Sequence, residues 1–501
     1  MLDSAWVEIV PLEKPVKAEI TVPGSKSITN RALILAALAH GKTTLRGALW
    51  SEDTQVMVDC LQKLGFSVMV EPDVKETSNR TIHVVGEGGK IPKSGTEEKP
   101  LDLFVGNAGT AARFVSALVC LGEGVYRLSG APRMHERPQR GLFGALGELG
   151  YRIDSEGGND KLPAKIYAQK SYVTGTNTLS RRFCRVDISE SSQFASALLM
   201  CAEFGHWIIE VRGENADESP YISMTKELMR IFPKGGGEFA IEPDASSATY
   251  FWAADVIIPG SSFWLQKEDP DAFEASVLEM MDDVIDAKLK TWNELDKHLE
   301  SRKKEGKLRM LEIAEKSVSV LGFPPSSIEE RRFRMQVDEK FMECAGGWPR
   351  YSFEISRKSD LGDSIMMAIV LGPFADEAVR YTDLGKLRVQ ETERVAALRT
   401  ELTKCGAKVE ENGDTLIVHP AKPGELHGAE VETYNDHRIA MCFAILGLNV
   451  HGIKLKNPSC VKKTFPDFFQ KLVAPPPAGL GVIIRDGKTG RELRGEELFA
   501  E

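Results

Sequence analysis

Six times along this chain, a short polar signature runs straight into an almost wholly apolar stretch of helical length. A helix that is apolar on all sides must be buried by other elements. Six such helices packed side by side would aim six polar N-termini, rich in Ser, Arg, Lys and Asp, at one place. The six stretches are GSKSITNR-ALILAALA, GNAGTAAR-FVSALVCL, SESSQ-FASALLMCA, PDASS-ATYFWAADVI, LGDS-IMMAIVLG and YNDHR-IAMCFAILGL.

Three amphipathic helices are predicted to end at a glycine and to lead into an alternating strand. Glycine is common just past the end of a helix, and alternation of apolar and polar residues is typical of a half-buried strand. The helix ends are LQKLG at 61–65, LGELG at 146–150 and LTKCG at 402–406. With the six signatures they predict a repeated unit of apolar helix, strand, amphipathic helix and strand, and therefore an α/β fold.

Two segments stand outside this repeat. Residues 285–350 form an insertion before the fifth signature, charged and helical in pattern, with a narrow apolar seam of Leu289, Trp292, Leu295 and Leu299. We interpret the insertion as a pair of surface helices rather than as an arm for a partner protein. The tail after Pro477 contains a DGKTG turn between VIIR and RELR, which predicts a short hairpin.

Composition narrows the class of protein. A chain of 501 residues can bury a large core, and its net charge of −10 argues against nucleic acid or an anionic membrane as the main partner. The eight cysteines form no CxxC pair, as expected for reduced core residues. The apolar runs are too short to span a membrane and the N-terminus lacks a basic leader. We therefore expect a cytoplasmic enzyme whose cationic site is local.

Cations at helix starts are the first sign of that site. Lys26 and Arg31 in the first signature and Arg438 in the sixth oppose the helix dipole, which is unfavourable unless an anion binds between them. The GxxxxGK[ST] pattern of a P-loop is absent from the sequence. Ser191 and Ser192 suit a helix cap and suit a phosphate or sugar hydroxyl equally well.

Other candidates have ordinary explanations when each is taken alone. Asp363 is a favoured partner for a helix N-terminus, and Glu391 and Arg394 are spaced as an exposed pair on one helix face. Arg133 and Arg137 are of a type that is more often on the surface. Together, the candidates predict a cationic pocket for a ligand with several anionic groups, plus two carboxylates for proton transfer.

The order of the motifs resembles that of 5-enolpyruvylshikimate-3-phosphate synthases, a family of enolpyruvyl transferases. GSKSxxNR, GNAGTAxR, PRMxERP, SSQFxxALLM, DASSAxYF, ETxR, DHRxAMCF and KTFPDFF span about residues 16–472 apart from the insertion. The resemblance implies a two-domain inside-out α/β barrel of six βαβαββ units, the insertion falling in the fifth. One domain would comprise 1–22 and 244–475, the other 23–243, followed by a tail at 476–501.

The resemblance also implies an activity and a role for each matching residue. The family transfers the enolpyruvyl group of phosphoenolpyruvate to shikimate 3-phosphate in chorismate and aromatic amino acid biosynthesis, without a metal or other cofactor, and we expect a monomer. Asp363 would take the proton of the attacking hydroxyl, and Glu391 would be the opposing acid. Lys26 would touch both substrates. Shikimate 3-phosphate would be held by Ser27, Arg31, Ser191, Ser192 and Gln193, and phosphoenolpyruvate by Gly109, Arg137, Arg394, Arg438 and Lys463.

Four positions depart from the family pattern. Gln390 stands where a lysine usually precedes the acidic residue, so one phosphate contact becomes neutral. Lys386 replaces a frequent asparagine, and its amine is expected to compensate for Gln390. Glu218 occupies the place of a serine near a phosphate, and Phe114 follows Arg113 where proline is common.

Two other functions fit parts of the sequence. The related UDP-N-acetylglucosamine enolpyruvyl transferases share the fold and phosphoenolpyruvate, but their reactive cysteine loop is missing here. A catalytically idle paralogue that uses the insertion as a docking scaffold would not need the two carboxylates and the cations. Phosphate release from phosphoenolpyruvate with shikimate 3-phosphate, against UDP-N-acetylglucosamine as control, discriminates among these functions.

Overall fold

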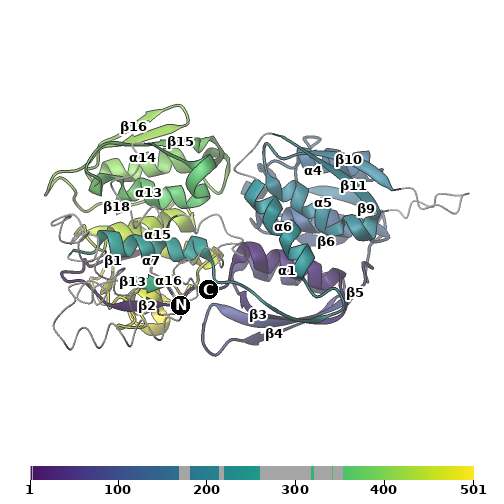
Figure 1. Ribbon diagram of the computed structural model, residues 1–501, viewed down its shortest axis with the longest axis horizontal. Coiled ribbons are helices and arrows are strands. Elements are labelled where there is room, and N and C mark those ends of the chain that lie inside the picture. Colours follow the sequence, from purple (N-terminus) through teal and green to yellow (C-terminus); the bar gives the residue numbers. More distant parts are fainter. Residues whose placement is uncertain are drawn as a thin grey trace, which may run out of the picture.

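The computed structural model describes residues 2, 4–168, 181–213, 219–259, 318–320, 341 and 354–500. Figure 1 shows two lobes side by side. Each has its own apolar core, formed in the α1 lobe by residues between 28 and 241 and in the α7 lobe by residues of 2–22 and 248–500. Both ends of the chain belong to the α7 lobe, because β20 (Ile484–Asp486) pairs with β1 (Trp6–Ile9). No helix in the described ranges is both long enough and apolar enough to cross a bilayer.

The six apolar stretches form buried helices, as predicted. Within each lobe the three helices pack against one another, and every residue of α3 and α13 is buried. The helices are α1 (Lys26–Leu38), α3 (Gly109–Val119) and α5 (Ser192–Gly205) in one lobe and α7 (Ala245–Ile257), α13 (Ile365–Leu371) and α15 (His437–Leu446) in the other.

Four four-stranded sheets share one pairing pattern, in which a parallel pair is followed by two antiparallel pairs. Their orders are β12-β3-β5-β4, β6-β7-β9-β8, β14-β15-β17-β16 and β18-β19-β1-β20. Two parallel pairs, β10-β11 and β13-β2, complete the mixed α/β architecture. The remaining strands are β2 (Ala18–Ile20), β3 (His40–Leu49), β4 (Ser67–Pro72), β5 (Asn79–Glu87), β6 (Leu101–Phe104), β7 (Gly124–Ser129), β8 (Arg152–Ser155), β9 (Ala164–Ala168), β10 (Arg182–Asp187), β11 (Trp207–Arg212), β12 (Gly237–Ala240), β13 (Val318–Val320), β14 (Glu354–Ser356), β15 (Val379–Thr382), β16 (Val409–Asn412), β17 (Thr415–Val418), β18 (Glu430–Val431) and β19 (Ile453–Lys456).

The three predicted glycine ends are confirmed. Gly65, Gly150 and Gly406 follow α2 (Glu52–Lys63), α4 (Arg140–Glu148) and α14 (Arg394–Lys404) with φ of +93°, +90° and +89°. This left-handed conformation suits glycine, and the strands β4, β8 and β16 follow as expected. The other helices of the described residues are α6 (Ser219–Ile231) and α16 (Phe468–Val473), with short helical turns at η1 (Pro132–His135), η5 (Arg357–Leu361), η6 (Gly362–Ser364), η7 (Gly372–Phe374), η8 (Leu384–Val389), η9 (Pro458–Lys463) and η10 (Gly495–Leu498).

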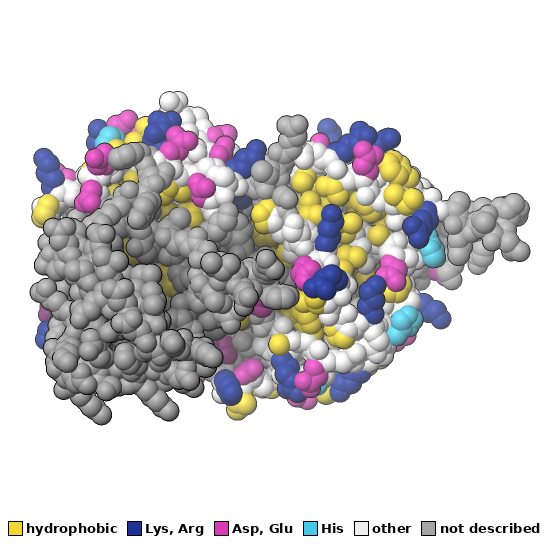
Figure 2. Space-filling model, viewed as in Figure 1, with side chains coloured by type: hydrophobic (Ala, Val, Ile, Leu, Met, Phe, Trp, Pro, Cys, Tyr) yellow, Lys and Arg dark blue, Asp and Glu magenta, His cyan; other side chains and the backbone are white. Residues whose placement is uncertain are grey.

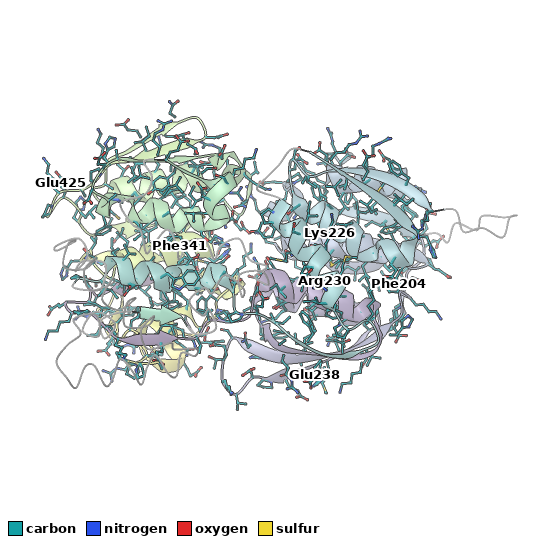
Figure 3. The ribbon with its side chains drawn as sticks, viewed as in Figure 1. Phe204, Lys226, Arg230, Glu238, Phe341 and Glu425 are labelled. Atoms are coloured by element: carbon teal, nitrogen blue, oxygen red, sulfur yellow. The ribbon has the colours of Figure 1, made fainter. Side chains whose placement is uncertain are left out.

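The interpretation of 285–350 as a surface excursion needs correction. Most of that segment, including the apolar seam, lies outside the described residues. However, its residues Val318–Val320 form β13, which pairs in parallel with β2 and packs against α7. Phe341 is 1% exposed in the core of the α7 lobe, where Figure 3 labels it. The segment therefore supplies parts of the fold.

The tail also joins this core. Its strand β20 is held on β1, and an isolated bridge between Arg485 and Glu492 closes the turn predicted for a hairpin. Leu498 and Ala500 are buried. Residues after Pro477 are thus packed against the α7 lobe rather than appended to it.

Among the described residues, some of the contacts that join the lobes lie near the two points where the chain passes between them. A bridge pairs Gly24 with Pro243, where the chain enters and leaves the α1 lobe. An interlobe cluster, which we define as Thr21, Glu76, Ser78, Asp467 and Lys471, lies nearby. Glu76 Oε2 accepts hydrogen bonds from Thr21 Oγ1 and Lys471 Nζ, both at 2.7 Å, and Ser78 donates to Asp467. Burial and the charge of Asp467 raise the pKa of Glu76 to about 7.

Candidate functional site

A cavity between the lobes is lined by residues from the start of every one of the six apolar helices. The helix starts contribute Lys26, Thr110, Ser191, Ser246, Asp363 and Arg438. The convergence predicted from the six signatures is therefore confirmed. On the face shown in Figure 2, basic and acidic side chains are interspersed over the α1 lobe and along the upper edge of the α7 lobe. The cavity, in contrast, gathers cations from both lobes, which suits an anionic ligand.

All but two of the site residues expected from the sequence line this cavity. Gly109 lies just behind the wall, where an added Cβ would come within 2.7 Å of guanidinium nitrogens of both Arg113 and Arg137. Lys463 also lies behind the lining, with Nζ 3.0 Å from Glu391 Oε1. The lining residues among the expected set are Lys26, Ser27, Arg31, Arg137, Ser191, Ser192, Gln193, Asp363, Lys386, Gln390, Glu391, Arg394 and Arg438.

Arg31 is fixed in the wall of the α1 lobe by three hydrogen bonds. It donates to Thr225 Oγ1 at 2.8 Å, to the Ser27 carbonyl at 2.9 Å and to Ser196 Oγ at 3.1 Å. Burial lowers its pKa to about 10, so it stays charged at neutral pH. The ring of Phe114 lies 5.3 Å from the guanidinium. Phe114, one of the departures from the family pattern, thus supports a predicted site residue by a cation–π contact.

Three further residues of the α1 lobe were not among the predicted site residues. Arg113 and Asp53 had not been singled out, and Arg133 was expected on the surface. Arg113 is 2% exposed and donates to the carbonyls of Gly109 and Pro138 at 3.1 and 2.8 Å. Its place one turn after Gly109 in the second signature was the available signal. Arg133 spans the lobes by donating to the Gln390 carbonyl at 2.9 Å, and Asp53 pairs with Lys26 at 3.2 Å.

Asp363 lies in the α7 lobe in the short turn η6 rather than inside the α-helix, which starts two residues later. Its carboxylate is 2.7 Å from Arg357 Nη2, 3.5 Å from Arg394 Nη1 and 3.9 Å from Arg438 Nε. Gln390 Nε2 adds a hydrogen bond at 3.2 Å. Burial opposes ionisation, but the three guanidinium groups outweigh it and lower the pKa of Asp363 far below its usual range.

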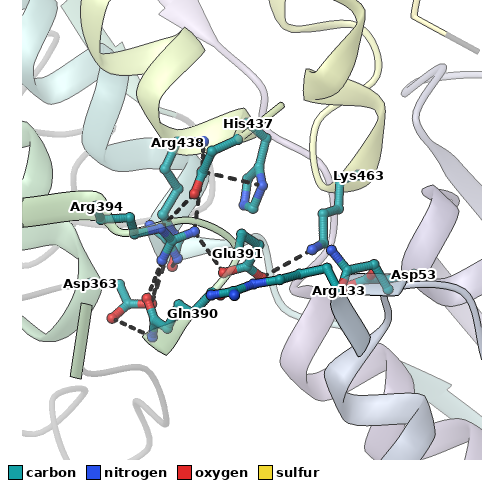
Figure 4. A network of polar contacts seen from close by, with 12 residues as sticks. Asp53, Arg133, Asp363, Gln390, Glu391, Arg394, His437, Arg438 and Lys463 are labelled. Atoms are coloured by element: carbon teal, nitrogen blue, oxygen red, sulfur yellow. Dashed lines mark hydrogen bonds and ion pairs between the residues drawn. The ribbon is translucent and has the colours of Figure 1, made fainter. Parts of the chain in front are cut away.

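Glu391 is the second buried carboxylate, and Figure 4 shows it between Arg394 and Lys463. The distances are 2.9 Å to Arg394 Nη2 and 3.0 Å to Lys463 Nζ. Burial again opposes ionisation, and the charges of Lys463, Arg394 and Arg137 lower the pKa of Glu391 well below its usual range. The interpretation of Glu391 and Arg394 as an exposed pair is therefore wrong, because Arg394 is 1% exposed.

Arg394 is held by Asp436 as well. Its Nε lies 2.7 Å from Asp436 Oδ2, and burial and the neighbouring cations lower the pKa of the adjacent His437 well below its usual range. The uncharged His437 leaves the positive charge to the arginines and lysines. Asp436 also caps α15 by accepting from the Arg438 backbone N–H at 2.9 Å, so one carboxylate holds the Arg394 side chain and the start of the helix that carries Arg438.

Gln390 and Lys386 both line the cavity. The Gln390 amide lies between two site residues: its Nε2 donates to Asp363 and its Oε1 accepts from Arg394. Compensation of Gln390 by Lys386 stays a prediction. Glu218 lies outside the described residues. Among the described residues no group of three or more His, Cys, Asp or Glu side chains is arranged to hold a metal ion.

Comparisons with known proteins agree with this geometry. The chain matches the family model of EPSP synthase (3-phosphoshikimate 1-carboxyvinyltransferase) over residues 10–234 and 352–472. It is 34% identical to the 3-phosphoshikimate 1-carboxyvinyltransferase of Nostoc punctiforme, covering 93% of this chain and 98% of that protein. It is also 34% identical to that of Serratia proteamaculans, covering 94% and 98%.

Solved structures show the same fold at lower identity. The EPSP synthase from Acinetobacter baumannii superposes with a TM-score of 0.59 at 19% identity, covering 96% of this chain and 99% of that one. The enolpyruvyl transferase NikO from Streptomyces tendae gives a TM-score of 0.55 at 14% identity, covering 96% and 98%. From its motifs, its converging helix starts and these matches, the chain belongs to the EPSP synthase family.

Proposed function

We propose that this protein transfers the enolpyruvyl group of phosphoenolpyruvate to the 5-hydroxyl of shikimate 3-phosphate and releases phosphate. The observation that carries the proposal is the convergence of cations from both lobes on a cavity that also contains two buried carboxylates. Both substrates are polyanions, and the reaction needs one group to accept a proton and another to donate one. The relatives are named 3-phosphoshikimate 1-carboxyvinyltransferases, which describes transfer of a carboxyvinyl group to this acceptor.

The two lobes divide the substrates in this proposal. The α1 lobe holds shikimate 3-phosphate through hydroxyls, an amide and the fixed guanidinium of Arg31, which suit a phosphate and ring hydroxyls. Arg137 extends from that lobe to phosphoenolpyruvate, whose carboxylate and phosphate otherwise meet Arg394, Arg438 and Lys463. Lys26 touches both substrates. The groups proposed for shikimate 3-phosphate are Ser27, Arg31, Ser191, Ser192 and Gln193, with Lys386 and Gln390 near a phosphate.

The chemistry then follows from the two carboxylates. Asp363 takes the proton of the 5-hydroxyl while the oxygen forms a bond to C2 of phosphoenolpyruvate and the methylene carbon takes a proton from Glu391. The resulting tetrahedral adduct loses phosphate as the bond between C2 and the phosphate oxygen breaks, with the proton on Asp363 passing to the departing phosphate. The methyl group returns a proton to Glu391, and the C–H electron pair restores the double bond. The clustered cations stabilise the departing phosphate.

Glu391 must be protonated before it can act as the acid. Lys463 and Arg394 hold it ionised at 3.0 and 2.9 Å. Binding of the phosphoenolpyruvate anion to these same cations would offset their charge and raise the pKa of Glu391. Substrate binding thereby prepares the proton donor, and closure of the lobes would exclude water from it.

The proposal includes a division of the chain. Residues 23–243 form one domain inserted between 1–22 and 244–475 of the other, each domain has three βαβαββ units in an inside-out barrel, and the enzyme acts as a monomer. Separate apolar cores and four sheets of one pairing pattern support this division.

Phosphate release tests the function directly. The full-length protein is mixed with phosphoenolpyruvate and either shikimate 3-phosphate or UDP-N-acetylglucosamine, with Asp363→Asn as a control variant. We expect phosphate only with shikimate 3-phosphate, and at a rate about 100-fold or more lower from Asp363→Asn than from the parent protein. Release with the nucleotide sugar would favour the related transferase, and release with neither acceptor would indicate an idle paralogue.

A further inference from the structure

Arg357 has the shortest contact to Asp363 among the cations with an ion pair to this carboxylate. It follows β14 at the first position of η5, a π-helical turn that leads directly into η6. Its Nη2 lies 2.7 Å from Asp363 Oδ1, and the residue is 4% exposed while still lining the cavity. Arg357 lies outside every sequence motif from which the site was predicted.

The other two cations of the described residues that form an ion pair with Asp363 are Arg394 and Arg438. Both lie farther from its carboxylate than Arg357 does, and Arg394 also has other partners. Arg394 is 3.5 Å away and also pairs with Glu391 at 2.9 Å and Asp436 at 2.7 Å. Arg438 is 3.9 Å away. A charge-assisted hydrogen bond at 2.7 Å fixes the orientation of a carboxylate more strongly than ion pairs at these longer distances.

We propose that Arg357 is a positioning residue for the reaction: it keeps Asp363 ionised and oriented to receive the hydroxyl proton. This inference rests on the proposed role of Asp363 as the base. When Asp363 takes that proton its negative charge disappears, so the pair with Arg357 weakens during the same step. Arg357 thus sets how readily the base is protonated, without itself exchanging a proton.

Every charged group around Asp363 bears on this inference. Because Arg357 is the largest favourable charge on Asp363 after the opposing effect of burial, its removal should raise the pKa of that carboxyl. The Gln390 side chain places a neutral amide 3.2 Å from Asp363 Oδ2 and 3.4 Å from Oδ1, the oxygen that Arg357 contacts. Among the described residues, the charged and titratable groups that contact Asp363 or line the cavity with it are Arg357, Arg394, Arg438, Lys386, Glu391, Tyr250, Lys26, His437, Arg31, Arg113, Arg137, Glu190, Tyr221 and Asp244.

The test measures kcat and both KM values between about pH 3 and 9 for the full-length enzyme, because the pKa of Asp363 starts far below its usual range. In Arg357→Gln we expect the acid limb of kcat to move upward by about one to three pH units, the range for loss of a close opposite charge. The KM values should change by less than about threefold. Arg357→Lys keeps the charge and should retain the parental limb. The double variant Arg357→Gln/Gln390→Lys should return the acid limb of kcat toward its parental pH, because a cation then faces Asp363 from position 390.

A matched control is Arg380→Gln. Arg380 is an exposed arginine on β15 that pairs with Glu354 at 3.4 Å, and its loss should leave the pH profile as in the parent.

An unchanged acid limb of kcat in Arg357→Gln overturns the inference. A raised KM without a shift of the acid limb overturns it as well, because Arg357 would then be a substrate contact. A raised limb in Arg357→Lys overturns it also, and this milder variant decides the question if the glutamine variant does not fold. Full turnover by Asp363→Asn would instead refute the proposed base.

Discussion

At the scale of single residues, burial and charge act against each other at both carboxylates of the cavity. Asp363 and Glu391 are buried beside guanidinium and ammonium groups, which lower the pKa of each. Removing either charge leaves those buried cations without their partner, so substitution should affect both chemistry and local stability. A conservative amide keeps the size of the side chain, so the substitution adds little change of packing to these two effects.

We therefore expect Asp363→Asn and Glu391→Gln each to lower kcat by about 100-fold or more, the usual contribution of general acid–base catalysis. Binding of the phosphate groups should remain largely intact. Steady-state kinetics and direct titration of shikimate 3-phosphate measure the two effects separately. Parental turnover in either variant would remove that residue from the mechanism.

Gly109 provides a test of the phosphoenolpyruvate side. In Gly109→Ala the new Cβ would lie 2.7 Å from guanidinium nitrogens of Arg113 and Arg137, so these groups must shift. We expect the KM for phosphoenolpyruvate to rise more than the KM for shikimate 3-phosphate. Gly147→Ala on α4 is the matched control, because its Cβ meets nothing within 4 Å. Equal rises in both KM values would contradict the placement of Gly109.

Residue patterns predicted most of the lining but not the contacts behind it. Lys26, Asp363 and Arg438 were recognisable because each stands at the start of an apolar run. Arg357 was not, because it precedes the fifth signature and meets Asp363 only through the η5–η6 turn. Phe114 could be noted as unusual, yet its stacking on Arg31 depends on how two helices pack.

At the scale of elements, the glycine helix ends are the part that local sequence determines best. The left-handed φ is needed wherever the chain reverses after these helices, whatever packs nearby. Packing differs, however: a Cβ at Gly406 would lie 2.2 Å from the Glu425 carbonyl oxygen, whereas one at Gly150 meets nothing within 4 Å. Alanine at position 150 therefore tests conformational strain alone, whereas alanine at position 406 tests strain and steric clash together.

Gly150→Ala should therefore cost about 1 kcal/mol of unfolding free energy, the strain of alanine at positive φ. Gly406→Ala should cost clearly more, because a backbone oxygen must also move. Urea denaturation of both variants against the parent measures the difference. Equal losses would show that the loop near Glu425 adjusts without cost.

Strand β13 is an element that could not be predicted from the sequence. Three residues between charged segments are too few for periodicity to distinguish a strand, and their pairing with β2 joins positions about 300 residues apart. Removal of 288–345 would delete this strand together with Phe341. Such a deletion is now expected to destabilise the α7 lobe, contrary to the surface interpretation.

Phe341→Ala tests that correction without deleting any backbone. A phenylalanine that is 1% exposed should cost about 3–5 kcal/mol when truncated. Thermal and denaturant unfolding measure the loss, and Phe204→Ala on the α1 lobe serves as a comparison at a partly buried site. A loss below about 1 kcal/mol would restore the surface interpretation of this part of the segment.

At the scale of the whole molecule, the interlobe cluster makes stability depend on pH. The folded pKa of Glu76 is about 7 and its ordinary value is 4.5, so the folded state binds the proton more tightly. The stabilisation is present below about pH 4.5 and is lost as the pH rises through about 7. The ionised carboxylate must then be accommodated beside Asp467 where the lobes meet.

Glu76→Gln should flatten the fall in Tm between pH 5 and 8, because the amide does not ionise. Glu238→Gln is a control: its exposed carboxylate pairs with Arg46, which lowers its pKa below this interval, so its curve should keep the parental slope. Figure 3 labels Glu238 on the α1 lobe. A parental slope in Glu76→Gln would show that Glu76 does not titrate in this interval.

The pairing of Gly24 with Pro243 has a consequence for how such a chain can be assembled. The two ends of the α1 lobe meet at one bridge, and that lobe has an apolar core of its own. A piece of chain whose ends meet can be cut out and its neighbours rejoined with little rearrangement. The lobe can therefore be treated as an exchangeable cassette: supplied as a separate polypeptide, or replaced by the same lobe from a relative, it would need to match its host only at this bridge, the interlobe cluster and the cavity.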